Sequence, residues 1–595
     1  MNNKFKMLYF ILTASILLTA CKKVLDQEPK ESATKNAVFS NEAGLQLYSN
    51  SFYSIVPSAS EIMRGDAMSD YAVRTEIPDY LRPNVYNATL SSGWSWGDLR
   101  NINYFLANNN NPSVSEAVRN NYNGIARFFR AWWYFQMVKR FGDVPWYSKP
   151  LAVDDSAELY KPRDPRQLVM DSVLADLNYA CDNITVTDDQ SRSLITKSVA
   201  YALKSRICLY EGTFRKYHTE LNLQGTANDW LTAAADAAEQ VISSHKFSLN
   251  QAGGAGKSYR QLFINTQPIA SEDILIDVTD PNLAVFSDAN WYWTSSTYGN
   301  RLSFDRIFVN TYLNIDGTPF TSISGHDTMT FPEETQNRDL RLEQTIRTPG
   351  YIRINGGSII PAPPDFSYTY TGYQPIKYSL DDTKYDQGTV SVNSVPVIRY
   401  AEILLNYAEA KEELGTFTDE DWSNTIGALR ARAGITGGLT SKPTVADSYL
   451  QQNYFPDISD PVLLEIRRER SIELAWEGFR FDDLMRWKKG NLLEQSWTGF
   501  YVPSLNTLID LDRDGKPDVA FVEQAPSNPV QGVTYVNVSP TINGKVNPQQ
   551  LTNGTYGELT WLKDAPREWT DNKYYYPIPE SALLKNPKLG QNPGW

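Results

Sequence analysis

The sequence predicts a mainly α-helical protein in which tetratricopeptide-like helix pairs form a base that carries a loop-rich region with a few short strands. Helical hydrophobic patterns recur in pairs with short connections. One pattern is apolar on two sides, as is typical of an inner helix in a stacked array. The stretch 247–398 is instead rich in Gly, Pro, Tyr, Thr and Ser and shows only short strand-like runs.

The chain begins with a secretory signal of the lipoprotein type, which we assign to residues 1–20. Lys4 and Lys6 precede an apolar run that ends in small residues directly before Cys21, as in the bacterial lipobox. The run is too short to remain in the mature protein as a membrane-spanning helix. We expect cleavage and attachment of lipid, including palmitate, at Cys21; the alternative is an ordinary signal with an incidental cysteine. Several acyl chains anchor a protein stably without spanning the bilayer.

The longest predicted helix runs through residues 124–141 and ends before Pro145. Two apolar stripes follow its 3.6-residue period. They comprise Phe128, Ala131, Trp132, Phe135 and Val138 on one side, and Phe129, Trp133, Met137 and Phe141 on the other. Because both stripes need burial, we expect this helix to pack between neighbours. Ser113 and Glu116 predict a capping box at its start, and Gly142 predicts its end.

Other helical patterns complete the predicted base. They cover residues 98–108, 230–244, 399–414 and 422–433, and two further patterns contain Cys181 and Cys208. If the two cysteine-containing helices pair antiparallel, their cysteines lie near opposite ends, beyond the reach of a disulfide. We therefore expect two buried thiols. In the loop-rich stretch, the runs DILIDV and GTVSVNSV favour short strands.

Three runs of the sequence resemble signatures of a known family. They are ARFFRAWWYFQMVKRFGDVPW in the long helix, EIRRERSIELAWEGFRFDDLMRW over residues 465–487, and YYYPIPESALLKNPKLGQNPGW at the end of the chain. Their order and spread are similar to those of the SusD/RagB family of Bacteroidetes surface lipoproteins. We expect an N-terminal helical region over 21–246, a loop-rich, ligand-facing insert over 247–398 and a C-terminal region over 399–595, together forming one compact body.

The resemblance also implies a function. It predicts a non-catalytic lipoprotein that captures glycan at the cell surface and delivers it to a TonB-dependent outer-membrane transporter of the SusC type. Two alternatives stay open, namely capture of peptides in the manner of RagB and a surface glycoside hydrolase. The formal net charge of −13 disfavours nucleic acid as a partner.

The charged run 465–487 could be mistaken for a catalytic site. Its charges are spaced three or four residues apart, as in Glu465 with Arg468 and Arg470 with Glu473. Two such carboxylates could serve a glycosidase, but each has a guanidinium neighbour. We expect an ion-pair lattice that holds the C-terminal helices together. The sequence contains no zinc-protease, phosphate-binding or dinucleotide-binding motif, and we expect neither catalysis nor a catalytic cofactor.

One loop has the spacing of a calcium site. Asp510, Asp512, Asp514 and Asp518 occupy positions one, three, five and nine of an EF-hand-type loop, with Gly515 at position six. Position twelve is phenylalanine instead of glutamate, so another side chain would have to complete the shell. The alternative is a solvated Asp-Gly turn. We favour a structural Ca²⁺ ion slightly over that turn.

Two loop stretches combine aromatic and polar side chains as a glycan site does. Pyranose rings stack on tryptophan and tyrosine, and their hydroxyls need amide or guanidinium partners. The first stretch, GWSWGDLRN, supplies Trp94, Trp96, Arg100 and Asn101. It resembles the family region that carries ligand-stacking tryptophans. We expect Trp94 to contact ligand and Trp96, which adjoins a helix, to join the core.

The second stretch, DANWYWTSSTYGNR, supplies Trp291, Trp293 and Tyr298. On an extended chain, alternate side chains point to the same side. We therefore expect Trp291 and Trp293 to form one exposed surface with Tyr298 close behind, and we place all three among the ligand-binding residues.

Overall fold

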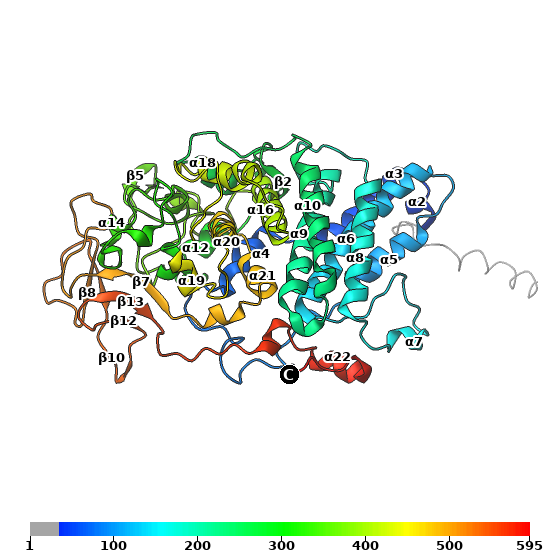
Figure 1. Cartoon of the computed structure of the whole chain (residues 1–595). Coiled ribbons are helices and arrows are strands. Elements are labelled where there is room, and N and C mark those ends of the chain that lie inside the picture. Colours follow the sequence, from blue (N-terminus) through cyan, green and yellow to red (C-terminus); the bar gives the residue numbers. More distant parts are fainter. Residues whose placement is uncertain (1–34) are drawn as a thin grey trace, which may run out of the picture.

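The computed structural model describes residues 35–595, so the predicted signal peptide and Cys21 lie outside the described residues. Several long helices stand side by side at one end of the molecule, whereas loops and most of the short strands gather at the other (Figure 1). The long helices at that end are α5 Gly97–Asn108, α6 Glu116–Phe141, α8 Arg166–Asn183, α9 Lys197–Tyr217 and α10 Ala227–Ile242, whereas α16 Tyr400–Glu413 and α20 Pro461–Glu473 lie nearer the middle. The mainly α fold that the sequence predicts is therefore confirmed.

Many shorter helices connect and cover these elements. They are α2 Lys35–Phe39, α3 Glu42–Ser49, α4 Ala59–Gly65, α7 Ser156–Leu159, α11 Ser258–Ile264, α12 Ala289–Thr294, α13 Arg306–Val309, α14 Phe331–Glu334, α15 Arg341–Thr345, α17 Asp419–Trp422, α18 Ala428–Arg432, α19 Ser448–Asn453, α21 Arg480–Arg486 and α22 Glu580–Lys585. Among residues 35–595, no helix combines the length and the apolar character that crossing a bilayer requires.

Helix α6 is the predicted central helix, and every side chain of its two apolar stripes is buried. It packs along α8 and also against α5 and α3. The predicted capping box was wrong by two residues, because the helix begins at Glu116 and its cap is Ser115, whose side chain accepts a hydrogen bond from the Val118 amide. Ser113 Oγ instead donates to the Ser40 carbonyl at 2.9 Å. Gly142 ends the helix with φ of 72°, as predicted.

The remaining helices of the base follow the sequence closely, with one interruption. Helix α9 packs along α10, which in turn contacts α16. Cys181 and Cys208 are free and buried, which confirms that prediction. The helix predicted over 422–433 is divided by a π-helical turn at Ser423–Gly427, between α17 and α18. A Cβ atom at Gly427 would lie 2.0 Å from the Leu439 carbonyl oxygen, so this close approach requires glycine.

The strands of residues 35–595 are short and form separate small sheets. They are β1 Ala72–Val73, β2 Asp273–Asp277, β3 Ser303–Phe304, β4 Ile352–Asn355, β5 Ser358–Pro361, β6 Val395–Arg399, β7 Trp497–Val502, β8 Val519–Val522, β9 Thr534–Asn537, β10 Thr541–Ile542, β11 Lys545–Val546, β12 Gln549–Leu551 and β13 Gly557–Trp561. Strand β2 confirms the DILIDV prediction and pairs antiparallel with β6. The strand predicted for GTVSVNSV was wrong except at its last residue, where β6 begins. Just before β6, the Asn393 side chain donates to the Phe263 carbonyl and the Ser394 side chain donates to the Thr266 carbonyl. These side-chain contacts take the place of the backbone hydrogen bonds of a strand pair.

Buried ion pairs around α20 join the loop-rich region to the C-terminal helices. Glu473 is contacted by Arg341 at 2.8 Å, by Arg399 at 2.6 Å and by Arg432. Burial opposes a charge on Glu473, but the three guanidinium groups hold its pKa well below the ordinary value. We call this group the ion-pair lattice. Its members are Glu272, Asp339, Arg341, Lys377, Arg399, Arg430, Arg432, Glu465, Glu469, Glu473 and Glu477.

The predicted lattice exists, but most of its pairs are long-range. The pair Glu465–Arg468 lies on one helix at 2.6 Å, as expected. Arg470 pairs with Asp483 at 2.8 Å and not with Glu473, which faces the loop-rich region. Spacing along a helix shows which side chains can be neighbours, but it cannot show that a buried face has partners on other elements.

Candidate functional site

A cavity of about 780 Å³ lies beside the start of α5. Its walls come from parts of residues 91–103, 145–160 and 579–589. These stretches belong to the loop into α5, the segment that contains α7, and the C-terminal segment that contains α22. All three helices lie toward the same side of the molecule (Figure 1). We call it the tryptophan cavity, because Trp94 and Trp96 both line it.

The loop that carries the two tryptophans is fixed at several points. Gly93 has φ of 91°, and a Cβ atom there would lie 3.2 Å from Arg140 Nε, so the turn favours glycine. Arg140 Nε donates to the Ser92 carbonyl at 2.9 Å, which ties the loop to α6. Ser91 Oγ donates to the Pro577 carbonyl at 2.6 Å, which ties it to the C-terminal segment.

Trp94 and Trp96 form a half-buried aromatic pair in this wall. Their ring centroids lie 5.4 Å apart in an edge-to-face arrangement. Trp94 also packs on Phe141 at 5.0 Å, and Trp96 packs on Trp133 at 5.0 Å. Trp96 thus contacts the core as expected, but it also lines the cavity. The α6 aromatics therefore support both indole rings from behind.

The two polar residues predicted beside the tryptophans lie in different environments. Arg100 lines the cavity and is exposed. Asn101 does not line it, because the side chain points toward the N-terminal helices. Its Oδ1 accepts from Tyr48 at 2.7 Å and its Nδ2 donates to Ser51 Oγ at 2.9 Å. Asn101 therefore holds α5 in place, and its predicted contact with ligand stays a prediction.

Sequence reasoning missed the other two walls of the cavity. The segment 145–160 is fixed through Tyr147, whose amide donates to Tyr134 at 2.6 Å and whose carbonyl accepts from Asn103 at 2.9 Å. Burial raises the pKa of Tyr147 to about 12, helped by Glu158, so its hydroxyl stays protonated at neutral pH. Two sequence features could have suggested that these segments matter, namely the Pro- and Tyr-containing run after α6 and the C-terminal family signature, but neither indicates that they meet at one cavity.

The C-terminal segment reaches the cavity through long-range backbone contacts. Asn586 Nδ2 donates to the Lys161 carbonyl at 2.9 Å, and the Glu580 amide donates to the Ala88 carbonyl at 3.1 Å. Helix α22 therefore closes one side of a site whose other sides form hundreds of residues earlier. Nothing in the local sequence pattern predicts this closure.

The second predicted stretch does not line the tryptophan cavity. Residues 289–294 form helix α12, on which positions two apart diverge, so the predicted shared surface of Trp291 and Trp293 was wrong. Trp293 is 6% exposed and packs on Trp476 at 5.3 Å. Trp291 instead stacks on Tyr298 at 3.8 Å with rings 12° apart. Tyr298 is 40% exposed, so this stacked pair is a surface aromatic feature.

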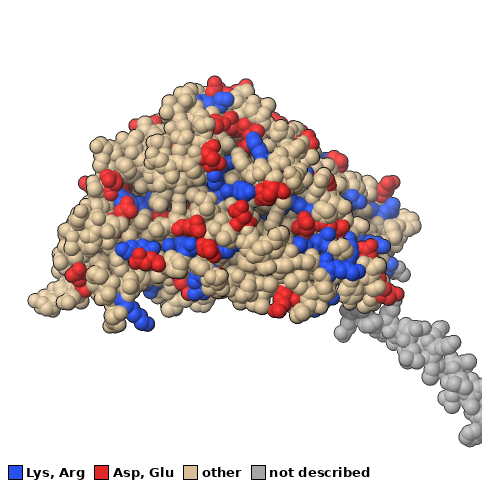
Figure 2. Space-filling view, turned by 60° about the horizontal axis from the view of Figure 1, so that its bottom comes forward, with Lys and Arg blue, Asp and Glu red and all other residues tan. Residues whose placement is uncertain are grey.

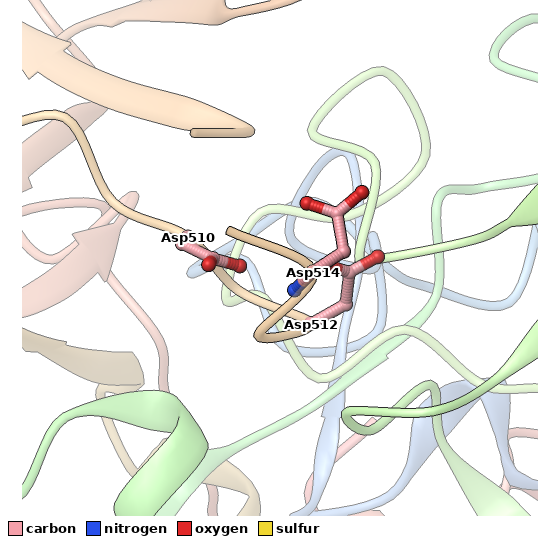
Figure 3. Close-up of side chains that lie close together, drawn as sticks. All are labelled: Asp510, Asp512 and Asp514. Atoms are coloured by element: carbon pink, nitrogen blue, oxygen red, sulfur yellow. The ribbon is translucent and has the colours of Figure 1, made fainter. Parts of the chain in front are cut away.

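The Asp-rich loop brings three of its four predicted ligands together. Carboxylate oxygens of Asp510, Asp512 and Asp514 all lie within 4.8 Å of one another on one tight turn (Figure 3). Asp518 is not in this group; its Oδ2 accepts from the Leu511 amide at 2.7 Å. Burial and the neighbouring carboxylates raise the pKa of Asp518 to about 6. The residue at position twelve, Phe521, is buried in β8 and offers no ligand.

The chemistry of this donor set fits Ca²⁺ in part. Carboxylate oxygens on a flexible turn are the ligands that Ca²⁺ prefers. Two features reduce the fit, because Lys516 Nζ lies 3.0 Å from Asp514 and the bidentate glutamate of an EF-hand is missing. Asp512 carries a raised pKa from burial and from its acidic neighbours, and a cation would relieve that repulsion.

Comparison with known proteins identifies the family. The model of the SusD family matches residues 277–595, and a model described as "Starch-binding associating with outer membrane" matches residues 30–205. SusD-like protein P2 of Formosa agariphila is 25% identical over 82% of this chain and 91% of its own length. A SusD-like protein of Bacteroides ovatus is 23% identical over 98% of this chain and 97% of its own.

Solved structures agree in fold. A SusD-like protein of Bacteroides fragilis superposes with a TM-score of 0.66 at 22% identity, covering 96% of this chain and all of the other. A SusD-like carbohydrate binding protein of the same species has a TM-score of 0.66 at 20% identity, covering 93% and 99%. Because the SusD family model covers more than half of the sequence, this chain belongs to the SusD family.

Proposed function

We propose that this protein is a non-catalytic, cell-surface lipoprotein that captures glycan in the tryptophan cavity and delivers it to a SusC-like TonB-dependent transporter. The carrying observation is the cavity of about 780 Å³ with Trp94 and Trp96 in one wall. Its size suits several sugar residues, and indole rings supply the apolar surface on which a pyranose stacks. One structural neighbour is described as carbohydrate binding, and one family model as starch-binding.

The composition of the cavity supports binding over hydrolysis. A glycosidase needs a pair of carboxylic acids on either side of the scissile bond. No Asp or Glu of the described residues lines the tryptophan cavity. A surface glycoside hydrolase would release sugar products during hours of incubation with bound polysaccharide. We expect no release above a protein-free control.

Binding of polysaccharides and peptides by calorimetry and by gel retardation tests this function. We expect binding to at least one polysaccharide, and we expect Trp94→Ala to weaken it about fivefold to tenfold, because stacking on an aromatic ring contributes roughly 1 to 1.4 kcal/mol. Trp291→Ala tests the other predicted aromatic site, which lies outside the cavity, and we expect it to bind as tightly as the unaltered protein. Binding to peptides only would replace glycan capture by the RagB-like alternative. Loss of binding in Trp291→Ala but not in Trp94→Ala would move the site to the Trp291–Tyr298 pair.

The location at the outer membrane rests on Cys21. Cys21→Ala removes the lipid attachment site while leaving residues 35–595 unchanged, so we expect the variant to be folded and to leave the membrane fraction. Cell fractionation followed by immunoblotting measures this, in cells without the transporter partner. A variant that stays in the outer-membrane pellet of those cells contradicts a lipid-only anchor.

A structural Ca²⁺ ion at Asp510, Asp512, Asp514 and Asp518 is a separate proposal. A ligand that binds only the native state raises the melting temperature by mass action. We expect metal-stripped protein to melt at a higher temperature after addition of excess Ca²⁺, and Asp512→Asn to reduce this shift. Equal melting curves with excess Ca²⁺ and with chelator count against the site.

A further inference from the structure

The charged residues that line the tryptophan cavity all have the same sign. They are Arg100, Lys149 and Lys585, one from each wall, and no Asp or Glu of the described residues joins them. The chain as a whole has a formal net charge of −13. The face that carries α22 shows acidic and basic side chains interspersed (Figure 2). A cationic lining is therefore a local property of this cavity.

These three cations lack internal partners. Within residues 35–595, Arg100, Lys149 and Lys585 make no salt bridge within 4.0 Å, and none donates a side-chain hydrogen bond. All three are exposed. Neither packing nor ion pairing within the described residues explains why these three cations lie beside an aromatic wall. Unpaired cations that converge on a cavity are ready to receive an anionic group.

Acidic residues close in sequence lie outside the lining of the cavity. Asp98, Asp154, Asp155, Glu158 and Glu580 adjoin the lining residues in the chain, but none of them lines the cavity. Asp155 caps α7 by accepting from the Glu158 amide, and Glu158 lies 3.7 Å from Lys161.

The neutral polar groups of the lining are divided between structure and ligand. Both polar atoms of the Asn103 amide have a partner within the protein, since Nδ2 donates to the Tyr147 carbonyl and Oδ1 accepts from Arg130. Asn586 is occupied in the same way, between the Lys161 carbonyl and the Lys588 amide. The groups left for a ligand are the three cations and hydroxyls such as those of Ser95 and Tyr160. The hydroxyls can donate to or accept from a neutral sugar, whereas the three cations are donors only and gain most from an anionic partner.

We propose that the glycan captured in the tryptophan cavity is anionic, with carboxylate or sulfate groups that pair with Arg100, Lys149 and Lys585 while a sugar ring stacks on Trp94. This inference rests on the proposed function and names its ligand class. Arg and Lys form charge-assisted hydrogen bonds with carboxylate and sulfate oxygens. The pairs are open to solvent, so salt weakens them.

Two matched pairs of polymers test the ligand class. Polygalacturonate is compared with its carboxyl-reduced form, and dextran sulfate with dextran, by affinity gel electrophoresis at low and high salt. We expect at least one anionic member to bind tenfold or more tightly than its neutral counterpart, and the pair that responds distinguishes carboxylate from sulfate. The variant Arg100→Gln, Lys149→Gln, Lys585→Gln should lose about tenfold in affinity, since each exposed pair contributes only a few-fold. The triple variant Lys257→Gln, Lys545→Gln, Lys563→Gln, at exposed positions outside the cavity, is the charge-matched control.

The outcomes distinguish a failure of the anionic ligand class from a failure of glycan capture itself. Equal binding of neutral and anionic members, or an unaffected triple variant with an unchanged melting temperature, overturns the anionic ligand but leaves glycan capture standing. Binding of none of the four polymers overturns the anionic ligand, and glycan capture falls with it only if the wider polysaccharide panel also fails to bind. Poly-L-glutamate carries the same charge without a sugar ring, so binding of it as tightly as polygalacturonate overturns the glycan class and favours an acidic peptide.

Discussion

The arginines of the ion-pair lattice and the cations of the tryptophan cavity carry the same charge in opposite environments, the first buried and paired, the second exposed and unpaired. In the lattice, Arg341 and Arg399 are fully buried, and each contacts several carboxylates. In the cavity, Arg100 is exposed and makes no salt bridge within residues 35–595. A buried charge must be paired inside the protein, because desolvation is costly. Unpaired cations are tolerated only where solvent or a ligand can reach them, which separates structural from ligand-facing charge.

Breaking the ion-pair lattice should have the largest effect on the stability of the protein. Glu473→Gln leaves three buried guanidinium groups without their shared carboxylate, and we expect a loss of about 3–5 kcal/mol in the free energy of unfolding. Urea denaturation followed by circular dichroism measures it. The control Glu76→Gln changes an exposed carboxyl and should leave the midpoint nearly unchanged. Similar midpoints for the two variants would show that the lattice contributes little to stability.

A carboxyl that adjoins the lattice sharpens the comparison through pH. Asp273 Oδ2 accepts from the Ile269 amide. Among the described residues, its Oδ1 has no hydrogen-bond partner and its side chain makes no salt bridge. Burial, assisted by Glu272, raises its pKa to about 7 from an ordinary value of 3.8. The folded protein thus binds this proton more tightly than the unfolded chain. The titration of Asp273 therefore lowers the free energy of unfolding as pH rises from about 4 to about 7.

Asp273→Asn removes this titration. We expect the melting temperature of the variant, relative to the unaltered protein, to increase as pH rises from 4 to 8. Other buried carboxyls are present in both proteins and cancel in the difference. A difference that stays constant over this range would contradict the assignment.

Neutralising the cavity should have the smallest effect on stability. The triple change at Arg100, Lys149 and Lys585 removes exposed charges that have no internal partner, so we expect the free energy of unfolding to change by less than about 0.5 kcal/mol. Urea denaturation beside Glu473→Gln gives the direct contrast. A loss above about 2 kcal/mol would show that these cations are structural, contrary to their place in the cavity.

The sequence predicts those features that depend on local pattern. The two stripes of α6 follow from helical period, and the loop with Trp94 and Trp96 follows from its composition. The predicted surface shared by Trp291 and Trp293 was wrong because residues 289–294 form a helix and not an extended strand. The hydrogen bonds of Asn101 could not be predicted from spacing, because its partners lie on helices far earlier in the chain.

The cavity itself needed the folded structure. Its walls join residues near 94, 149 and 585, and this association depends on backbone contacts such as that between Asn586 and Lys161. The single sign of its charges appears only once the walls are together. In the sequence, Lys149 and Lys585 are ordinary surface lysines.

A crystal structure of the protein with the oligosaccharide that binds most tightly tests the central claim most directly. We predict that the sugar occupies the tryptophan cavity, with one ring stacked on Trp94 and an anionic substituent within hydrogen-bond distance of Arg100, Lys149 or Lys585. Sugar bound elsewhere, for example on the Trp291–Tyr298 pair, with the tryptophan cavity empty, would contradict it.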